Sequence, residues 1–200
     1  MLDDPANAGV NVVVWAWEGR LSSESSTYVD AYLNDMALLQ TDYPSVTFVH
    51  MTGHLDGSGE SGNLHLLNEQ IRAQVAATGG VLFDYADIES FDPDGNGYLA
   101  LGGNDDCSYS GGNWADEWCA ANPGDPLCTA NSCAPSRSLN CNLKGRAFWW
   151  MLARVAGWPG IEDGDAPARK VPVLPAAACL VLAVLLLLAC FAAATRRSTT

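Results

Sequence analysis

Several polar side chains follow apolar runs that have the composition of β-strands. Glu18 follows the first run, His54 follows the second, and Asp87 and Glu89 lie at the end of the third. The carboxyl ends of parallel strands meet at one edge of a sheet, where open α/β proteins bind ligands, so we expect these groups to lie together. A histidine beside carboxylates suits proton transfer or metal binding, which makes His54 and Asp87 the candidate catalytic residues. The alternative is that these side chains cap elements and order loops.

A second polar cluster, the run DPDGNG, begins at residue 92. It places oxygen-bearing side chains at positions 1, 3 and 5 of a loop and glycine at position 6, as calcium-binding loops do. Position 12 is Gly103 in place of the usual glutamate, although acidic residues follow at once. The predicted calcium ligands are Asp92, Asp94, Asn96 and Asp106. A plain turn of Asp, Asn and Gly explains the same letters and stays open as the alternative.

Cysteines are concentrated in one irregular stretch rich in Gly, Asn and Asp. Five of them, Cys107, Cys119, Cys128, Cys133 and Cys141, fall within 35 residues. Such clustering favours disulfides and an oxidising compartment. A zinc site is the rival interpretation, but the five lack the two-residue spacing of a zinc knuckle, and no histidine lies among them. Because five is odd, at least one thiol is expected to be free or to have its partner elsewhere.

Tryptophans in the irregular stretch suggest a sugar-binding surface. Trp114 and Trp118 are the candidates for stacking on a sugar, whereas Trp149 and Trp150 are interpreted as helix-packing residues. The alternative is that all four belong to the core.

The elements that must position these groups are indicated by the spacing of apolar residues. Three β-branched or aromatic runs predict strands buried on both faces, at 10–17, 46–51 and 81–88. Two apolar stripes at helical spacing lie between them, the first opened by Ser25 and the second ended by Gly79. The order is β-α-β-α-β, with crossovers long enough for parallel strands. The sequence therefore predicts an α/β fold with a parallel sheet.

A last helix is predicted at 144–157, where apolar residues recur at helical spacing and should pack on the sheet. The stretch 89–143 shows neither helical nor strand periodicity. So long an irregular segment in a compact domain is usually functional or cross-linked, so we expect cysteines and calcium to hold it.

The C-terminal region contains an apolar run that could cross a membrane. Residues 176–194 carry no charge and no proline, and 19 helical residues match the hydrocarbon layer of about 30 Å. A buried core helix is the alternative. The predicted organisation is an α/β domain at 1–160, a linker at 161–172, a transmembrane helix at 173–195 and a short basic tail at 196–200.

The charge balance argues against one class of partner. The chain has 23 acidic and 10 basic residues, a formal net charge of −13. Four of the basic residues flank the apolar run, at positions 169, 170, 196 and 197, so the region before it is still more acidic. A field of this sign repels phosphate backbones, which argues against nucleic acid and favours cations.

The N-terminal residues MLDDPANAG show neither the basic start nor the apolar stretch of a signal peptide. Because the cysteines and the apolar run indicate export, either the chain uses a tail-anchor route or the true start of the protein lies upstream, and we favour the second.

Four stretches of the chain resemble the later two-thirds of the secreted SGNH (GDSL-like) hydrolase-fold proteins. They contain the strings VNVVVWAWEGR, MTGHLDG, ADIESFDPDGNG and LNCNLKGRAFWW, between residues 11 and 158. The resemblance implies a flavodoxin-like sheet with helices on both faces, and ester hydrolysis by a serine from an N-terminal block with a histidine from a C-terminal one. No serine block precedes the first predicted strand, and Pro135 occupies the place where these proteins often have histidine. The domain is therefore expected to be partial and to have little or no esterase activity.

The tail, VPVLP followed by the apolar run and two arginines, is similar to bacterial sorting signals. It implies a cell-envelope protein whose domain lies outside the membrane. Two functions follow. The first is a membrane-anchored relative of esterases that act on carbohydrate or other esters, inactive as it stands. The second is a non-catalytic, calcium-stabilised surface module that binds a glycan or a protein partner.

Overall fold

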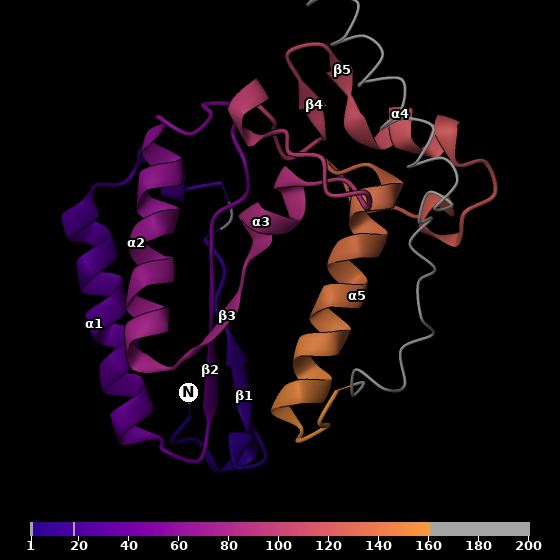
Figure 1. Ribbon diagram of the computed structural model, residues 1–200. Coiled ribbons are helices and arrows are strands. Elements are labelled where there is room, and N and C mark those ends of the chain that lie inside the picture. Colours follow the sequence, from indigo (N-terminus) through magenta and orange to yellow (C-terminus); the bar gives the residue numbers. More distant parts are fainter. Residues whose placement is uncertain (1, 18, 161–200) are drawn as a thin grey trace, which may run out of the picture. The chain divides into compact units, whose positions relative to one another are not determined.

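A parallel sheet of three strands forms the centre of the computed structural model, which describes residues 2–17 and 19–160 (Figure 1). The strands are β1 (Val12–Val14), β2 (Thr47–Met51) and β3 (Val81–Phe83), in the order β1-β2-β3. Both strand pairs are parallel, with Val13 opposite Phe48 and His50 opposite Leu82. The predicted parallel sheet is confirmed. Glu18, the linker 161–172, the predicted transmembrane helix 173–195 and the tail 196–200 lie outside the described residues.

The position of each strand in the sheet decides its burial. β2 lies in the middle, and its Phe48, Val49 and His50 are buried. β1 lies at an edge, where Val14 is 37% and Trp15 is 38% exposed. The prediction that all three strands are buried on both faces is therefore wrong for β1.

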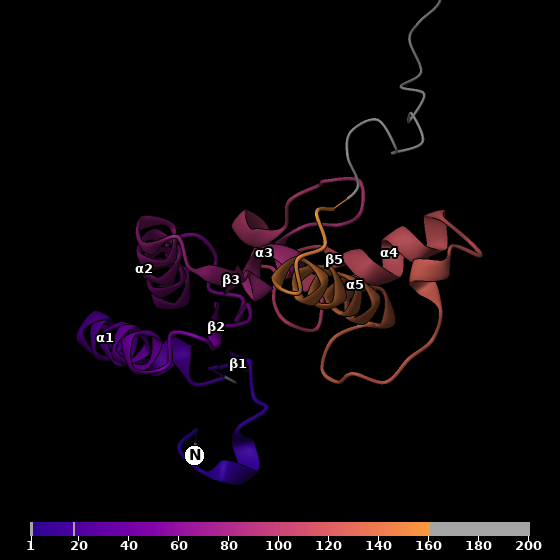
Figure 2. The same ribbon diagram turned by 90° about the horizontal axis from the view of Figure 1, so that it is seen from below.

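Helices α1 (Ser26–Asp42) and α2 (Asn63–Thr78) cover one face of the sheet (Figures 1 and 2). Ser25 caps α1, since its hydroxyl accepts a hydrogen bond of 3.2 Å from the Tyr28 amide. Gly79 ends α2 with φ +65°, a left-handed conformation that glycine adopts without a steric penalty. The apolar stripes of both helices face inward, as predicted. These stripes and two residues that follow β1 form one buried cluster. Its members are Trp17 and Leu21 after β1, Val29 and Leu33 of α1, and Leu64, Leu67, Ile71 and Val75 of α2.

Helix α5 (Ser138–Val155) covers the opposite face, as Figure 2 shows. Val49, Phe83 and Met151 form the buried centre of this second layer. The Phe148 ring meets the Phe83 ring edge-on, with centroids 5.3 Å apart. Helices therefore cover both faces of the sheet. The predicted helix 144–157 exists, but it begins earlier, at Ser138.

The chain after β3 differs from the sequence prediction. β3 ends at Phe83, and helix α3 (Tyr85–Ser90) follows in place of the predicted longer strand. Asp84 causes the change, because its carboxylate accepts a hydrogen bond of 3.1 Å from the Asp87 amide and so caps α3.

The predicted irregular segment also contains short elements. They are a hairpin of β4 (Ser108–Tyr109) and β5 (Gly112–Asn113), followed by α4 (Trp114–Ala121). Short 3₁₀ helices lie at Pro5–Asn7, Leu21–Ser23, Leu99–Leu101 and Pro126–Cys128.

Two disulfides cross-link the segment that contains α4 and the start of α5, Cys119–Cys128 and Cys133–Cys141. The prediction of at least one disulfide is confirmed. Cys107 is the free thiol that the odd count required, and it is fully buried.

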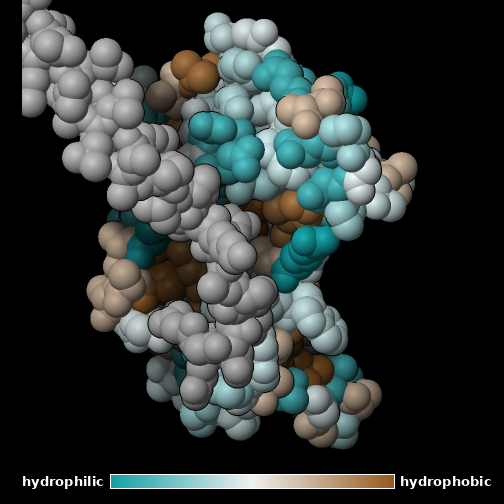
Figure 3. Space-filling view, turned by 45° about the vertical axis from the view of Figure 1, so that its right-hand side comes forward, coloured by the Kyte–Doolittle hydropathy of each residue, from teal (hydrophilic) through white to brown (hydrophobic). Residues whose placement is uncertain are grey.

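Hydrophilic residues dominate the upper part of the face seen in Figure 3, and hydrophobic residues show in recesses below them. Within residues 2–17 and 19–160, no helix combines the length and hydrophobicity that crossing a bilayer requires.

Candidate functional site

A cavity of about 220 Å³ lies beyond the carboxyl ends of β1 and β2. This is the edge where the sequence predicts a site. His54, Glu89, Asp105 and Ser136 contribute its polar wall. The aromatic and apolar wall comes from Trp17, Met51, Tyr85, Ala134 and Pro135. The volume is below the roughly 300–1,000 Å³ of sites for drug-sized ligands, so the cavity suits a small chemical group.

Hydrogen bonds of the two residues before His54, Thr52 and Gly53, fix the MTGH segment at the rim of the cavity. The Thr52 hydroxyl donates a hydrogen bond of 3.0 Å to Asp84 and accepts one of 2.9 Å from the Ala86 amide. The side-chain amide of Asn68 accepts a 2.8 Å bond from Gly53 N and donates a 3.1 Å bond to Gly53 O. These bonds fix the backbone that carries His54.

Gly53 has no room for a side chain. A β-carbon there would lie 2.9 Å from Leu21 Cδ2 and 2.9 Å from Leu64 Cδ1, both in the buried core. Glycine at this position lets the strand end pack against α2.

His54 forms a hydrogen-bonded pair with Asp105, with 3.1 Å between His54 Nδ1 and Asp105 Oδ2. Both side chains are about one-third exposed, at 30% and 28%. A carboxylate on Nδ1 orients the imidazole and leaves Nε2 for proton transfer. A β-carbon built on Gly19 would lie 3.8 Å from Nε2, so this nitrogen faces the backbone that follows β1.

Asp87, the carboxylate predicted to act with His54, does not line this cavity. It lies on α3, exposed, beside a separate hollow that it lines together with Arg72 and Asp84. The pairing predicted from sequence is therefore replaced by His54 and Asp105. Asp87 lies away from the cavity because the chain enters α3 at Asp84, the residue that follows β3.

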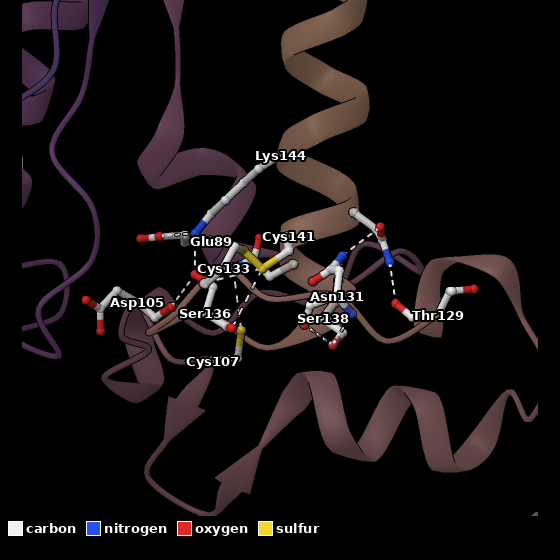
Figure 4. The surroundings of a disulfide bond; sticks show 12 residues. Glu89, Asp105, Cys107, Thr129, Asn131, Cys133, Ser136, Ser138, Cys141 and Lys144 are labelled. Carbon is white, nitrogen blue, oxygen red and sulfur yellow. Dashed lines mark hydrogen bonds and ion pairs between the residues drawn. A yellow bond between two sulfur atoms is a disulfide. The ribbon is translucent and has the colours of Figure 1, made fainter.

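A buried charged network borders the cavity (Figure 4). Lys144 Nζ lies 2.6 Å from Glu89 Oε1 and 2.5 Å from Ser136 Oγ. Glu89 Oε2 accepts a 2.6 Å bond from the Leu55 amide, and the Lys144 ammonium lies 4.2 Å from the centre of the Tyr85 ring. Burial raises the pKa of Glu89, although Lys144 and the Leu55 amide act in the opposite direction. The network fastens α3 to α5 and positions Ser136 at the cavity wall.

The Ser136 hydroxyl makes two hydrogen bonds in this network. It donates a hydrogen bond of 2.7 Å to the Asp105 carbonyl oxygen and accepts one from the Lys144 ammonium. The hydroxyl proton of Ser136 therefore points to a carbonyl oxygen and not to a base that would activate the hydroxyl as a nucleophile.

The DPDGNG loop closes on itself through the Asp92 carboxylate. Asp92 Oδ1 accepts bonds of 3.0 and 2.9 Å from the amides of Asp94 and Asn96. Asp92 Oδ2 accepts bonds of 2.8 and 3.1 Å from the Asn96 side chain and the Tyr98 hydroxyl. This is the hydrogen bonding of an Asp-Asn-Gly turn, the alternative that the sequence left open.

The other predicted calcium ligands point to different partners. Asp94 Oδ2 accepts a 2.9 Å bond from the Trp118 indole, and Asp106 Oδ1 accepts a 2.8 Å bond from the Ser108 amide. Among the described residues, no three His, Cys, Asp or Glu side chains are grouped as a metal site requires. Calcium binding stays a prediction.

We expect Asp92→Ala to lower the free energy of unfolding by about 3 kcal/mol, because it removes the acceptor of four hydrogen bonds from a buried position. Burial acts against ionisation of Asp92, but the hydrogen bonds together outweigh it and lower its pKa. A carboxylate with a lowered pKa stabilises the fold above its unfolded pKa of about 3.9, and this stability is lost as the pH falls. Chemical denaturation from pH 7 to pH 3 should therefore show a shallower acid loss in Asp92→Asn than in the native chain.

The exposed Asp35→Asn is the matched control for Asp92, since it removes a charge from the surface of α1. Equal acid sensitivity of all three proteins would contradict the role of Asp92.

Millimolar calcium tests the metal prediction in the same assay. A rise in the melting temperature that Asp92→Ala and Asp94→Ala abolish would support calcium, and a rise that both leave unchanged would reduce the loop to a turn.

The tryptophans are placed opposite to the sequence prediction. Trp114 is 0% and Trp118 is 9% exposed, so neither offers a face to a sugar. Trp149 and Trp150, predicted to be packing residues, are 75% and 54% exposed. The prediction failed because both follow Phe148 directly, and one or two helical positions rotate a side chain by about 100° or 200° away from the packed face.

Comparison with known proteins found no match among family models, curated proteins or solved structures. The fold itself defines the class: a mixed α/β protein with a three-stranded parallel sheet, helices and two disulfides. The likeness to SGNH hydrolases rests on the sequence motifs alone.

Proposed function

We propose that this chain is a membrane-anchored, extracytoplasmic protein of the SGNH-hydrolase type that binds a small ester-bearing or sugar group without hydrolysing it. The observation that carries the proposal is the content of one cavity. It contains a histidine and carboxylate pair, His54 and Asp105, but its serine, Ser136, is held by Lys144.

Ester hydrolysis by a serine mechanism needs an activated hydroxyl, a base within hydrogen-bond reach and donors for the oxyanion. The His54–Asp105 pair supplies a base and the group that orients it. Ser136 is the only serine that lines the cavity in the described part of the chain, and its hydroxyl is bonded to the Asp105 carbonyl and to Lys144. Pro135, which also lines the cavity, has no side-chain group that could take a proton. A cavity with a base but without an activated hydroxyl is expected to bind an ester group without hydrolysing it.

Location outside the cytoplasm is supported by the two disulfides, which persist in oxidising compartments. Anchoring is supported by the uncharged run 176–194, whose length matches a bilayer.

The aromatic part of the same cavity supports the second candidate function, glycan binding. Tyr85 lines it beside the polar His54 and Asp105, whereas Trp17, which also lines it, is 4% exposed and belongs to the core. Sugars bind to sites that combine an aromatic wall with hydrogen-bonding groups. An acetylated sugar presents both an ester and a ring, so one ligand class tests both functions.

We expect the purified chain to hydrolyse p-nitrophenyl acetate and acetylated sugars no faster than His54→Ala does, because the cavity offers a base without a nucleophile. Pro135→His should not restore turnover, since it adds a second base and no hydroxyl. Binding is followed separately through the NMR signal of the His54 imidazole, which an acetylated sugar should shift.

His65→Ala is the control for the removal of a histidine, because His65 lies on α2 and does not line the cavity. Thermal unfolding of each variant checks that the fold is retained. Robust turnover by the native chain that His54→Ala abolishes and His65→Ala preserves would overturn the proposal and make His54 a catalytic residue.

A further inference from the structure

An exposed tryptophan patch lies at the C-terminal end of α5 and in the turn after it. It consists of Trp149, Trp150 and Trp158, which are 75%, 54% and 40% exposed. With Arg146 and neighbouring residues of α5 they line a groove of about 630 Å³. Three large exposed indoles on one surface mark a site of contact with another molecule or with a membrane.

The patch is ordered by contacts of its own. The Arg154 guanidinium lies 5.6 Å from the centre of the Trp150 ring, and Arg154 Nη1 donates a hydrogen bond of 3.2 Å to the Trp158 carbonyl oxygen. These contacts hold the turn 156–158 against the last turn of α5. The rings are therefore presented together.

The charge of α5 is opposite to that of the chain as a whole. The helix contains Lys144, Arg146 and Arg154 and no acidic residue, whereas the chain carries a net charge of −13. Lys144 is neutralised by the buried Glu89. Arg146 and Arg154 are exposed beside the tryptophans. A basic surface with tryptophans complements anionic lipid headgroups.

The sequence ties this patch to the predicted membrane span. Trp158 lies two residues before Gly160, the last described residue, and fifteen further residues, 161–175, lead to the uncharged run 176–194. Fifteen residues reach at most about 50 Å when fully extended. If the run spans the bilayer, the end of α5 is the part of the domain tethered most closely to its surface.

We propose that the tryptophan patch docks on the bilayer surface, with the indoles at the level of the headgroups and Arg146 at lipid phosphates. Tryptophan prefers this interface because its ring is apolar and its N–H is polar. Docking would fix the orientation of the domain on the membrane. This inference rests on the anchoring part of the proposed function.

The test uses the full chain reconstituted in vesicles of phosphatidylcholine and phosphatidylglycerol, with lipids brominated near the headgroup. Bromine quenches the fluorescence of indoles close to it. We expect the native chain to be quenched and Trp149→Ser/Trp150→Ser/Trp158→Ser to lose most of the quenching. Trp15→Ser, which removes a partly exposed indole next to β1, is the control and should remain quenched.

Absence of quenching in the native chain, or equal quenching in the triple variant, would overturn docking. Alkaline carbonate separates this failure from failure of the anchor. A chain that resists carbonate without being quenched is anchored but not docked, whereas release by carbonate refutes the span itself. A fluorescence shift caused by a soluble oligosaccharide and lost in the triple variant would reassign the patch to glycan binding.

Discussion

Replacing Lys144 by methionine is expected to lower the free energy of unfolding by about 3–5 kcal/mol, the usual cost of leaving a buried charge without its partner. Glu89 is fully buried, and Lys144 is its ion-pair partner at 2.6 Å. Methionine keeps most of the apolar length of lysine, so the lost charge dominates the effect. Urea denaturation followed by circular dichroism measures the change.

The effect of Lys144→Met should depend on pH in a defined direction. Burial already raises the pKa of Glu89, and removal of the ammonium should raise it further. A carboxyl whose pKa is raised in the folded state favours folding below its unfolded pKa of about 4.3, and this stability is lost as the pH rises through the folded value. Lys144→Met should therefore be closest to the native chain near pH 4 and furthest from it near pH 8.

Two further variants make the prediction for Lys144 specific. Glu89→Gln combined with Lys144→Met should recover most of the lost stability, because no buried charge remains. Arg146→Met removes the same charge from an exposed position two residues along α5 and should change stability by less than about 0.5 kcal/mol. A loss that is equal at pH 4 and pH 8 would show that Lys144 stabilises the fold by packing alone.

Asn68→Leu is expected to lower the free energy of unfolding by about 2–4 kcal/mol, since two buried backbone groups of Gly53 would lose their partners. The side chain is 1% exposed, and its amide bonds both Gly53 N and Gly53 O. Leucine fills a similar volume, so the missing hydrogen bonds decide the outcome. Amide hydrogen exchange should become faster at Gly53 and His54, which follow β2, than within β2 itself.

Leu66→Gln is the control for Asn68, because Leu66 lies on the same helix with 59% exposure. It should leave both stability and exchange close to native. If Asn68→Leu loses stability without faster exchange at Gly53, the amide supports α2 and not the segment that carries His54.

The sequence predicts the first half of the fold well because its signals there are local. Ser25 and Gly79 bound helices whose apolar stripes follow one period, and the β-branched runs before, between and after these helices form the sheet. The predicted length of β3 was wrong because Asp84 caps a helix inside the run VLFDYADI. The other residues of this run are typical of a strand, and they outweighed Asp84 in the prediction.

The sequence predicted where the candidate site lies, but it predicted only some of the residues that form it. His54 was found because it follows a strand at the carboxyl edge. Asp105 and Ser136 were missed as its neighbours, since the chain reaches the cavity through loops whose path no periodicity reveals. The Glu89–Lys144 pair joins residues 55 positions apart, and a single sequence carries no signal for such a contact. One local clue existed, a single lysine within an otherwise apolar stripe of α5.

The open position at Gly19 bears on how activity can arise or disappear in evolution. A β-carbon there would lie 3.8 Å from His54 Nε2, so the hydroxyl of a serine at this position could reach that nitrogen. Together with His54 and Asp105 this serine would supply the three side chains of a serine-hydrolase triad. Glycine and serine codons can differ by one nucleotide. A lineage with this cavity therefore stands one mutation away from the side-chain set of a hydrolase, and the reverse mutation removes the nucleophile.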